Sequence, residues 1–357
     1  MNQPTFKDLL AQKSWSRYED YISEGVREYS GNLAREIALG KEMKKKIREY
    51  VANNFEIKSV PKDLDEESRL LSSGQVIGID GTVSSHKTIS GTMAQIGIVA
   101  VNYLNEKIKH SFFISEARYK EDSADVADYL FLHELQNKVL SNLVIHAILL
   151  YRERELGLDE AFKDKFKLYH GPLLPFELMS DLGRLRALES TLGLLKQIIH
   201  DKRCCSIISR SQNDAYIRLG LSLEPGEYIK LHKSLGREII DERRLLLHHD
   251  KWREQDFIKV NTFLQQDAGR LCIGIIKISQ RPYVFHAHEE FFDLIARIIA
   301  RDSGFQKEKG FPLLIDYADS LCSSFFKASD FNKIIEYQLA KEGEFLSETS
   351  EEALRQK

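Results

Sequence analysis

Asp80 is the acidic residue that the sequence places best for chemistry. It follows the apolar run of residues 76–79 (VIGI) and precedes Gly81. β-branched residues favour a buried strand, and an Asp-Gly pair is typical of the place where a strand gives way to a turn. The pattern predicts a strand that ends at the rim of a sheet and presents a carboxylate there. Such a carboxylate could hold Mg²⁺ or Mn²⁺, which prefer hard oxygen ligands, or it could simply cap the turn.

Two further acids stand near the C-terminus, within the segment GFPLLIDYADSL of residues 310–321. Asp316 and Asp319 lie three positions apart inside an apolar element, so one helical turn could direct both carboxylates toward the same side. Together with Asp80, such acids could hold divalent cations that hydrolyse a phosphodiester bond, since this chemistry uses two ions to activate water and to neutralise the leaving group.

The elements that must position these acids follow from periodicity. Period-two or continuous apolar patterns predict strands, and three- to four-residue spacing of apolar residues predicts helices. The predicted order is strands over residues 75–80, 91–104 and 108–114, a helix over 122–156, a strand over 166–169, a helix over 182–199 and a strand over 205–208. This is the order of the ribonuclease H-like fold, an α/β fold with a mixed sheet flanked by helices.

Enzymes with that architecture carry acids at the end of the first strand, on the following helix, at the end of the fourth strand and near a terminal helix. Asp80 fills the first place, Glu134 the second and Asp319 the last, while His170 stands in the third. Glu134 is preferred on the helix because it lies among apolar residues rather than in the charged ends. The helix position stays open, because five other acids compete for it: Asp122, Asp125, Asp128, Glu153 and Glu155.

Four short motifs in this order resemble the NurA nucleases. They are Ile79-Asp80-Gly81-Thr82, residues 168–173 (LYHGPL), residues 207–211 (IISRS) and residues 310–319 (GFPLLIDYAD). The resemblance covers roughly residues 75–330, and the order of the motifs carries it because each one is short and degenerate.

The chain departs from this family at one position. The family has aspartate where this sequence has His170. A neutral imidazole can ligate manganese, but it adds no negative charge to offset two divalent cations. Three interpretations remain open: His170 is a ligand or proton carrier, Glu177 or Asp181 supplies the missing carboxylate, or the site is weakened. A plain turn residue before Gly171 is the alternative to all three.

The resemblance implies a metal-dependent deoxyribonuclease that uses Mn²⁺ or Mg²⁺ and acts with a HerA-like hexameric ATPase in DNA end processing, repair or antiviral defence. It also implies a homodimer, with Asp80, Glu134, His170 and Asp319 at the catalytic site. Lys202, Arg203 and Arg210 flank a strand near that site and could hold DNA phosphates. Two other functions stay open, a NurA-like adaptor that docks on the ATPase or on DNA without cutting, and cleavage of RNA.

Composition sets modest limits. The 357 residues have a net charge of −3 and are 43% hydrophobic, which allows a large core and excludes a uniformly basic DNA-coating protein. Residues 81–88 (GTVSSHKT) resemble a phosphate-binding loop, but His86 replaces the glycine at which such a loop must close, so no nucleotide site is predicted. We expect a cytoplasmic protein with no membrane segment, because no apolar run is long enough to span a bilayer.

The expected domain organisation has three parts. Residues 1–74 form an N-terminal helical region and linker, residues 75–340 form the nuclease-like domain, and residues 341–357 form a polar tail. Within the domain, residues 221–270 are read as an irregular, partly helical insertion, and residues 286–290 (HAHEE) as the solvated start of a helix.

Overall fold

The computed structural model describes residues 7, 26–88, 91–115, 142–180, 187–211, 213–241 and 254–343. The chain divides into two units, Met1–Asn54 and Phe55–Lys357. In the first unit, the helix α3 (Val26–Asn54) confirms the expected helical region. The first unit ends at residue 54, and the strand and the helix that lie within residues 55–74 belong to the second unit. Across the described residues, no helix is both long and apolar enough to cross a membrane.

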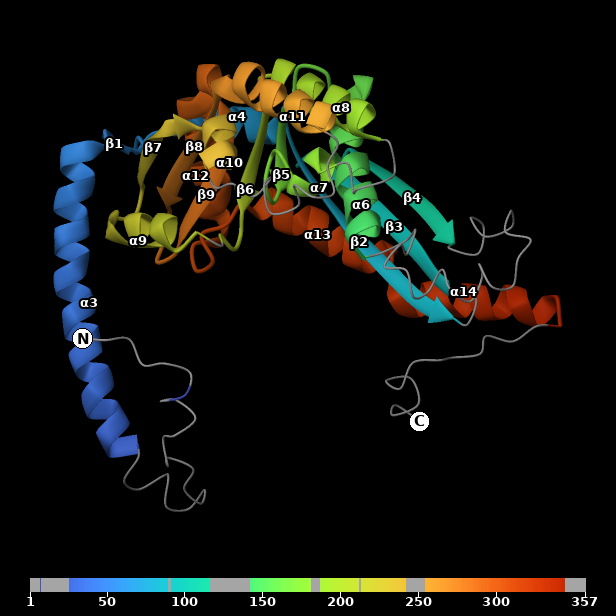
Figure 1. The fold of residues 1–357 in the computed structure, drawn as a ribbon, viewed down its shortest axis with the longest axis horizontal. Helices are drawn as coiled ribbons and strands as arrows, with labels where there is room; N and C mark the ends of the chain where they lie inside the picture. The colour runs from blue at the N-terminus through green and yellow to red at the C-terminus, as the bar shows by residue number, and fades with distance from the viewer. Residues whose placement is uncertain are drawn as a thin grey trace. The chain divides into compact units, whose positions relative to one another are not determined.

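The second unit is built on a mixed nine-stranded sheet with the strand order β1-β7-β8-β9-β6-β5-β2-β3-β4 (Figure 1). The strands are β1 (Ile57–Ser59), β2 (Val76–Thr88), β3 (Gly91–Val101), β4 (Lys107–Ser115), β5 (Phe166–His170), β6 (Cys204–Ile208), β7 (Glu227–Ser234), β8 (Leu271–Lys277) and β9 (Pro282–His288). β2, β3 and β4 form an antiparallel meander, β5 runs parallel to β2, and β6 runs parallel to β5. This arrangement is the predicted ribonuclease H-like core.

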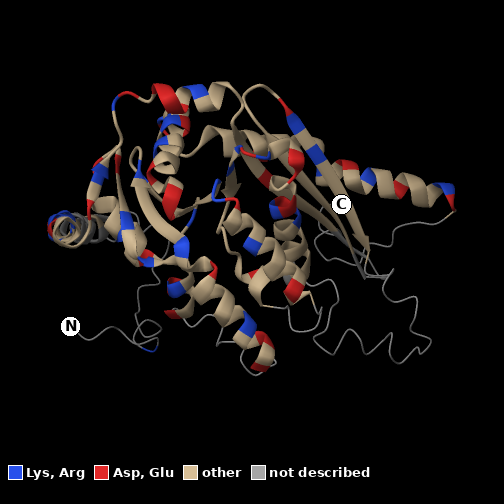
Figure 2. Cartoon of the chain, turned by 90° about the horizontal axis from the view of Figure 1, so that it is seen from above, with Lys and Arg blue, Asp and Glu red and all other residues tan. Residues whose placement is uncertain are grey.

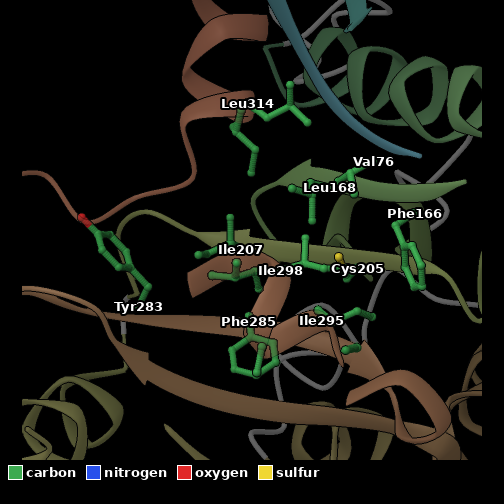
Figure 3. Packing of buried hydrophobic residues seen from close by; sticks show 14 of the residues in the cluster. Val76, Phe166, Leu168, Cys205, Ile207, Tyr283, Phe285, Ile295, Ile298 and Leu314 are labelled. Carbon is green, nitrogen blue, oxygen red and sulfur yellow. The ribbon is translucent and has the colours of Figure 1, made fainter. Parts of the chain in front are cut away.

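Helices cover both faces of the sheet. Their bounds are α4 (Asp65–Ser72), α6 (Asn142–Gly157), α7 (Phe176–Met179), α8 (Leu188–His200), α9 (Asp214–Ser222), α10 (Leu235–Asp241), α11 (Glu254–Gln266), α12 (Phe292–Ser303), α13 (Leu313–Phe325) and α14 (Ala328–Lys341). On one face, α13 packs over the even-numbered residues of β2 and β5, and α12 packs over β8 and β9. Val76, Leu168 and Leu314 join a single buried cluster on this face (Figure 3). On the other face, α6 lies against Ile79 and Tyr169.

A tight fit fixes α13 on the sheet. A Cβ atom added to Gly78 would stand 2.5 Å from the carbonyl oxygen of Leu314, so only glycine lets the helix approach β2 this closely. The start of α13 is held by the buried carboxylate of Asp302, which accepts a hydrogen bond of 3.0 Å from the Leu314 amide and another from the Tyr103 hydroxyl. The helix that carries Asp319 is therefore anchored at its N-terminal end.

Three sequence-based expectations were wrong. β2 does not end at Asp80 but continues to Thr88, because β3 pairs with it along its whole second half. The segment 221–270 holds the expected helical part in α10 and α11, but its first part is not irregular, since it contributes β7, which pairs with β1 and β8 inside the sheet. His286 and His288 do not start a solvated helix. They are buried in β9, because alternation in a strand fits this segment as well as the start of a helix.

Candidate active site at the fork between two strands

Asp80 lies where β2 parts from β5. The two strands pair from Val76 to Ile79, opposite Phe166 to Tyr169, and beyond that point β2 pairs with β3 alone. The Asp80 side chain is only 8% exposed, and its Oδ1 accepts a hydrogen bond of 3.0 Å from the Gly81 amide. Asp80 therefore lies within the sheet, at the point where two strands separate. The sequence predicted a strand end at this position, and the structure has a fork between two strands.

His170 is the next residue across this fork. It ends β5, and its Nδ1 lies 3.6 Å from Asp80 Oδ1. Its Nε2 is 2.9 Å from the hydroxyl of Ser209, and its ring meets that of Phe311 edge-on at 5.7 Å. The neighbouring carboxylate of Asp80 raises the pKa of His170, against the opposing effect of burial. An imidazole held between an acid and a hydroxyl is placed to accept or donate a proton.

Asp319 comes to the same fork from α13. The Cys322 thiol, one turn further along, donates to the main-chain oxygen of Asp80 at 3.2 Å, which fastens this helix beside the acid. Burial raises the pKa of Asp319, and the negative charge of Asp80 acts in the same direction. Asp316 points elsewhere, since Lys309 pairs with it at 2.5 Å and Gln306 donates to it at 2.8 Å. This geometry agrees with the choice of Asp319 over Asp316.

Glu153 is the helix carboxylate that the structure brings to the fork. It belongs to α6, on the opposite face of the sheet, and a Cβ added to Gly81 would stand 2.8 Å from its Oε1. Its side chain is buried, and its Oε2 accepts a 2.5 Å hydrogen bond from Arg154 Nη1. Burial raises the pKa of Glu153 to about 7, and the negative charge of Asp80 raises it further while Arg154 opposes the shift.

The other predicted acids stand apart from this group or outside the described residues. Glu134, the sequence-based choice on the helix, and Asp181 both lie outside the described residues. Glu177 pairs with His146 at 3.2 Å instead of completing the site beside His170. A signal for Glu153 was present in the sequence: it lies four residues after Leu149, whose spacing puts both on one buried helix face.

The three basic residues are divided between the two ends of β6. Lys202 and Arg203 precede the strand and pair with Glu290 at 2.6 Å and Asp164 at 3.0 Å. Arg210 follows the strand, on the same end as Ser209 and His170. Figure 2 shows positive and negative residues interspersed over the described chain. Of the three, Arg210 is the one near the fork.

The donor types at the fork suit a divalent cation, since two buried carboxylates, a third carboxylate and an imidazole are ligands that Mn²⁺ accepts. In the part of the chain that the structure describes, no three of these groups form a set that could enclose an ion. A divalent cation does not need three protein ligands, because Mg²⁺ and similar cations often keep several waters and bind through one or two carboxylates. Asp80 and Glu153 lie near enough for the charge of Asp80 to raise the pKa of Glu153, and both are the carboxylate ligands that this mode uses.

The fold and the site define an α/β protein of the ribonuclease H-like class with acids at the β2–β5 fork. Its described fold is that of NurA: the crystal structure of the NurA nuclease from Sulfolobus solfataricus is 12% identical, covers 89% of this chain and 98% of its own, and gives a TM-score of 0.51. A structure of NurA bound to dAMP and manganese is 8% identical over 88% of this chain and 96% of its own, with a TM-score of 0.49. No protein-family model and no curated protein sequence matches the chain.

Proposed function

We propose that this protein is a metal-dependent deoxyribonuclease that hydrolyses phosphodiester bonds. The observation that carries the proposal is the meeting of Asp80, His170 and Glu153 at the fork between β2 and β5, in a chain with the NurA fold. Perturbed pKa values caused by burial and by neighbouring charge are typical of catalytic groups. This activity is the DNA cleavage that the resemblance of the sequence motifs to the NurA nucleases implies.

The residues divide the work of hydrolysis among them. A bound Mn²⁺ or Mg²⁺ supplies Lewis acidity to the phosphate and lowers the pKa of a water molecule. Asp80 and Glu153 would hold such an ion from the two faces of the sheet, and Asp319 would bind one of its waters or the ion itself. His170 is placed to take the proton of the attacking water as the new oxygen–phosphorus bond forms and the bond to the departing sugar oxygen breaks.

The remaining parts of the proposal concern partners. DNA is the substrate, and Arg210 would contact its phosphates beside the fork, since guanidinium groups suit phosphate oxygens. We further propose that the protein acts as a homodimer with a HerA-like hexameric ATPase in DNA end processing, repair or antiviral defence. These last points rest on the motif resemblance, and gel filtration of the mixed proteins at low salt tests them.

The test of the nuclease is a pair of acid-to-amide variants. Asp80→Asn should abolish Mn²⁺-dependent cleavage of labelled single- and double-stranded DNA by the full chain. Asp164→Asn is the matched control, because Asp164 pairs with Arg203 at the other end of β6, and it should leave cleavage unchanged. Equal cleavage by wild type and a folded Asp80→Asn protein would remove Asp80 from the mechanism. An RNA substrate of the same sequence separates DNA from RNA cleavage.

A second candidate function is a non-cutting adaptor. Two observations favour it: a histidine replaces the third acid, and Arg154 already occupies one oxygen of Glu153. An adaptor would bind DNA or the ATPase in a pull-down experiment and leave DNA intact at every Mn²⁺ and Mg²⁺ concentration. The cleavage assay therefore decides between the two functions.

A further inference from the structure

We infer that Arg154 supplies this site with a permanent positive charge in place of a second metal ion, so that the site takes one divalent cation and not two. The inference deepens the proposed nuclease function and rests on it. Two-ion phosphodiesterases neutralise crowded carboxylates with two cations. In this site, the buried guanidinium of Arg154 neutralises part of the carboxylate charge.

Arg154 is fixed in place by contacts on several sides. Its side chain is fully buried, with Nη1 2.5 Å from Glu153 Oε2. Its Nη2 donates a 2.6 Å hydrogen bond to the carbonyl of Pro172, in the loop that follows His170. The guanidinium also lies 5.0 Å from the centre of the Tyr169 ring. A guanidinium does not lose its proton in proteins, so this charge is present at every working pH.

The pairing limits what Glu153 can offer a metal. One carboxylate oxygen faces Arg154, and the other, Oε1, faces the Gly81 backbone beside Asp80. Glu153 can therefore give a single oxygen to an ion near Asp80. Bidentate binding, or bridging between two ions, would require it to leave Arg154 with a buried charge that has lost its partner, which is costly.

The charges of the site match one divalent cation. Asp80, Glu153 and Asp319 carry three negative charges when ionised, and Arg154 cancels one of them, which leaves two. His170 adds no negative charge, and in its protonated state it lowers the remainder to one. One Mn²⁺ neutralises what remains, whereas a second would leave an excess of positive charge in a partly buried site, where charges interact strongly.

Direct counting of bound Mn²⁺ tests this inference. Electron paramagnetic resonance measures the free Mn²⁺ during titration of the full chain at pH 8. Wild type should bind one ion and Asp80→Ala none. Arg154→Met should bind two ions, or the first at least tenfold more tightly, because a fixed positive charge beside the carboxylates is removed. Arg152→Met is the matched control on the same helix, since Arg152 pairs with the exposed Glu155, and it should bind as wild type does.

Circular dichroism shows which variants are folded, and His170→Asp replaces Arg154→Met if the latter does not fold. That variant adds a negative charge at the fork and should tighten binding at least tenfold. Two ions or none on wild type would overturn the inference, as would unchanged binding by both charge variants. Two ions with DNA cleavage would overturn it and leave the nuclease proposal intact. One ion without cleavage would support it and exclude the nuclease.

Discussion

The buried pair Arg154–Glu153 allows a sharp stability prediction, because a nearly identical exposed pair stands beside it on α6. Arg154 Nη1 and Arg152 Nη1 each lie 2.5 Å from their acids. The side chains of the first pair are 0% and 4% exposed, and those of the second are 41% and 47% exposed. The two pairs therefore differ mainly in burial, which decides what a broken ion pair costs.

Arg154→Met leaves Glu153 buried with no opposite charge, and breaking a buried pair in this way costs about 3–5 kcal/mol. The Pro172 carbonyl also loses its hydrogen-bond donor. The cost of this loss falls within the same range, because the methionine side chain keeps part of the packing. Arg152→Met removes a solvent-screened pair worth about 0.2–1 kcal/mol. The double variant Glu153→Gln/Arg154→Met removes both charges and should recover much of the lost stability, since a neutral buried pair avoids the unpaired charge.

Urea unfolding at pH 8, followed by circular dichroism, measures these differences, and unequal slopes would show that unfolding is not two-state. Millimolar Mn²⁺ should restore part of the stability of Arg154→Met, because an ion that binds only the folded state stabilises it by mass action. If Arg154→Met loses no more stability than Arg152→Met, the argument that Arg154 neutralises a buried Glu153 is refuted.

Three further predictions concern the same fork and its support. The pKa of His170 is raised by Asp80, so the interaction between them stabilises the fold below about pH 6.5. This stabilisation is lost as the pH rises through the pKa of His170 in the folded state. Urea unfolding should therefore show that the stability difference between wild type and His170→Gln shrinks as the pH rises over that range. The pKa of Glu153 is raised to about 7, so the folded state holds a proton that the unfolded state releases near pH 4.5, and wild type should lose stability relative to Glu153→Gln between pH 5 and 7. Gly78→Ala should cost about 1–3 kcal/mol because its Cβ meets a helix backbone that cannot move freely. Gly193→Ala, in open space within α8, should instead stabilise the protein by about 0.5–1 kcal/mol, and thermal unfolding of both checks the contrast.

The sheet could be predicted from sequence because its signals are local. Alternating or continuous apolar residues located β3, β4, β5, β6 and the start of β2 within a few residues, and their order indicated the fold. The end of β2 could not be predicted in this way. Asp80-Gly81 looks like a turn, yet the backbone stays extended to Thr88 because pairing with β3 supplies hydrogen bonds that outweigh the local turn preference.

The site was only partly predictable, for a reason that involves three-dimensional packing. Asp80, His170 and Asp319 stand at positions that a ribonuclease H-like topology brings together, so motif order was enough to select them. The helix carboxylate depends on which face of α6 meets the sheet. That choice is set by contacts such as Gly157 against Tyr169, and its only local signal is the four-residue spacing of Leu149 and Glu153. Glu153 therefore remained one of several possibilities until α6 was placed.

The charges at the fork are arranged against stability, and this is the strongest physical reason to regard it as a binding site. Asp80 raises the pKa of both Glu153 and Asp319, which means that its charge repels each of these two acids. A fold selected for stability alone would gain from apolar residues there. Arg154 relieves only one of these charges. The two that remain are what a divalent cation, and through it a phosphate, would neutralise, so the cost in the free protein is recovered when the ion binds.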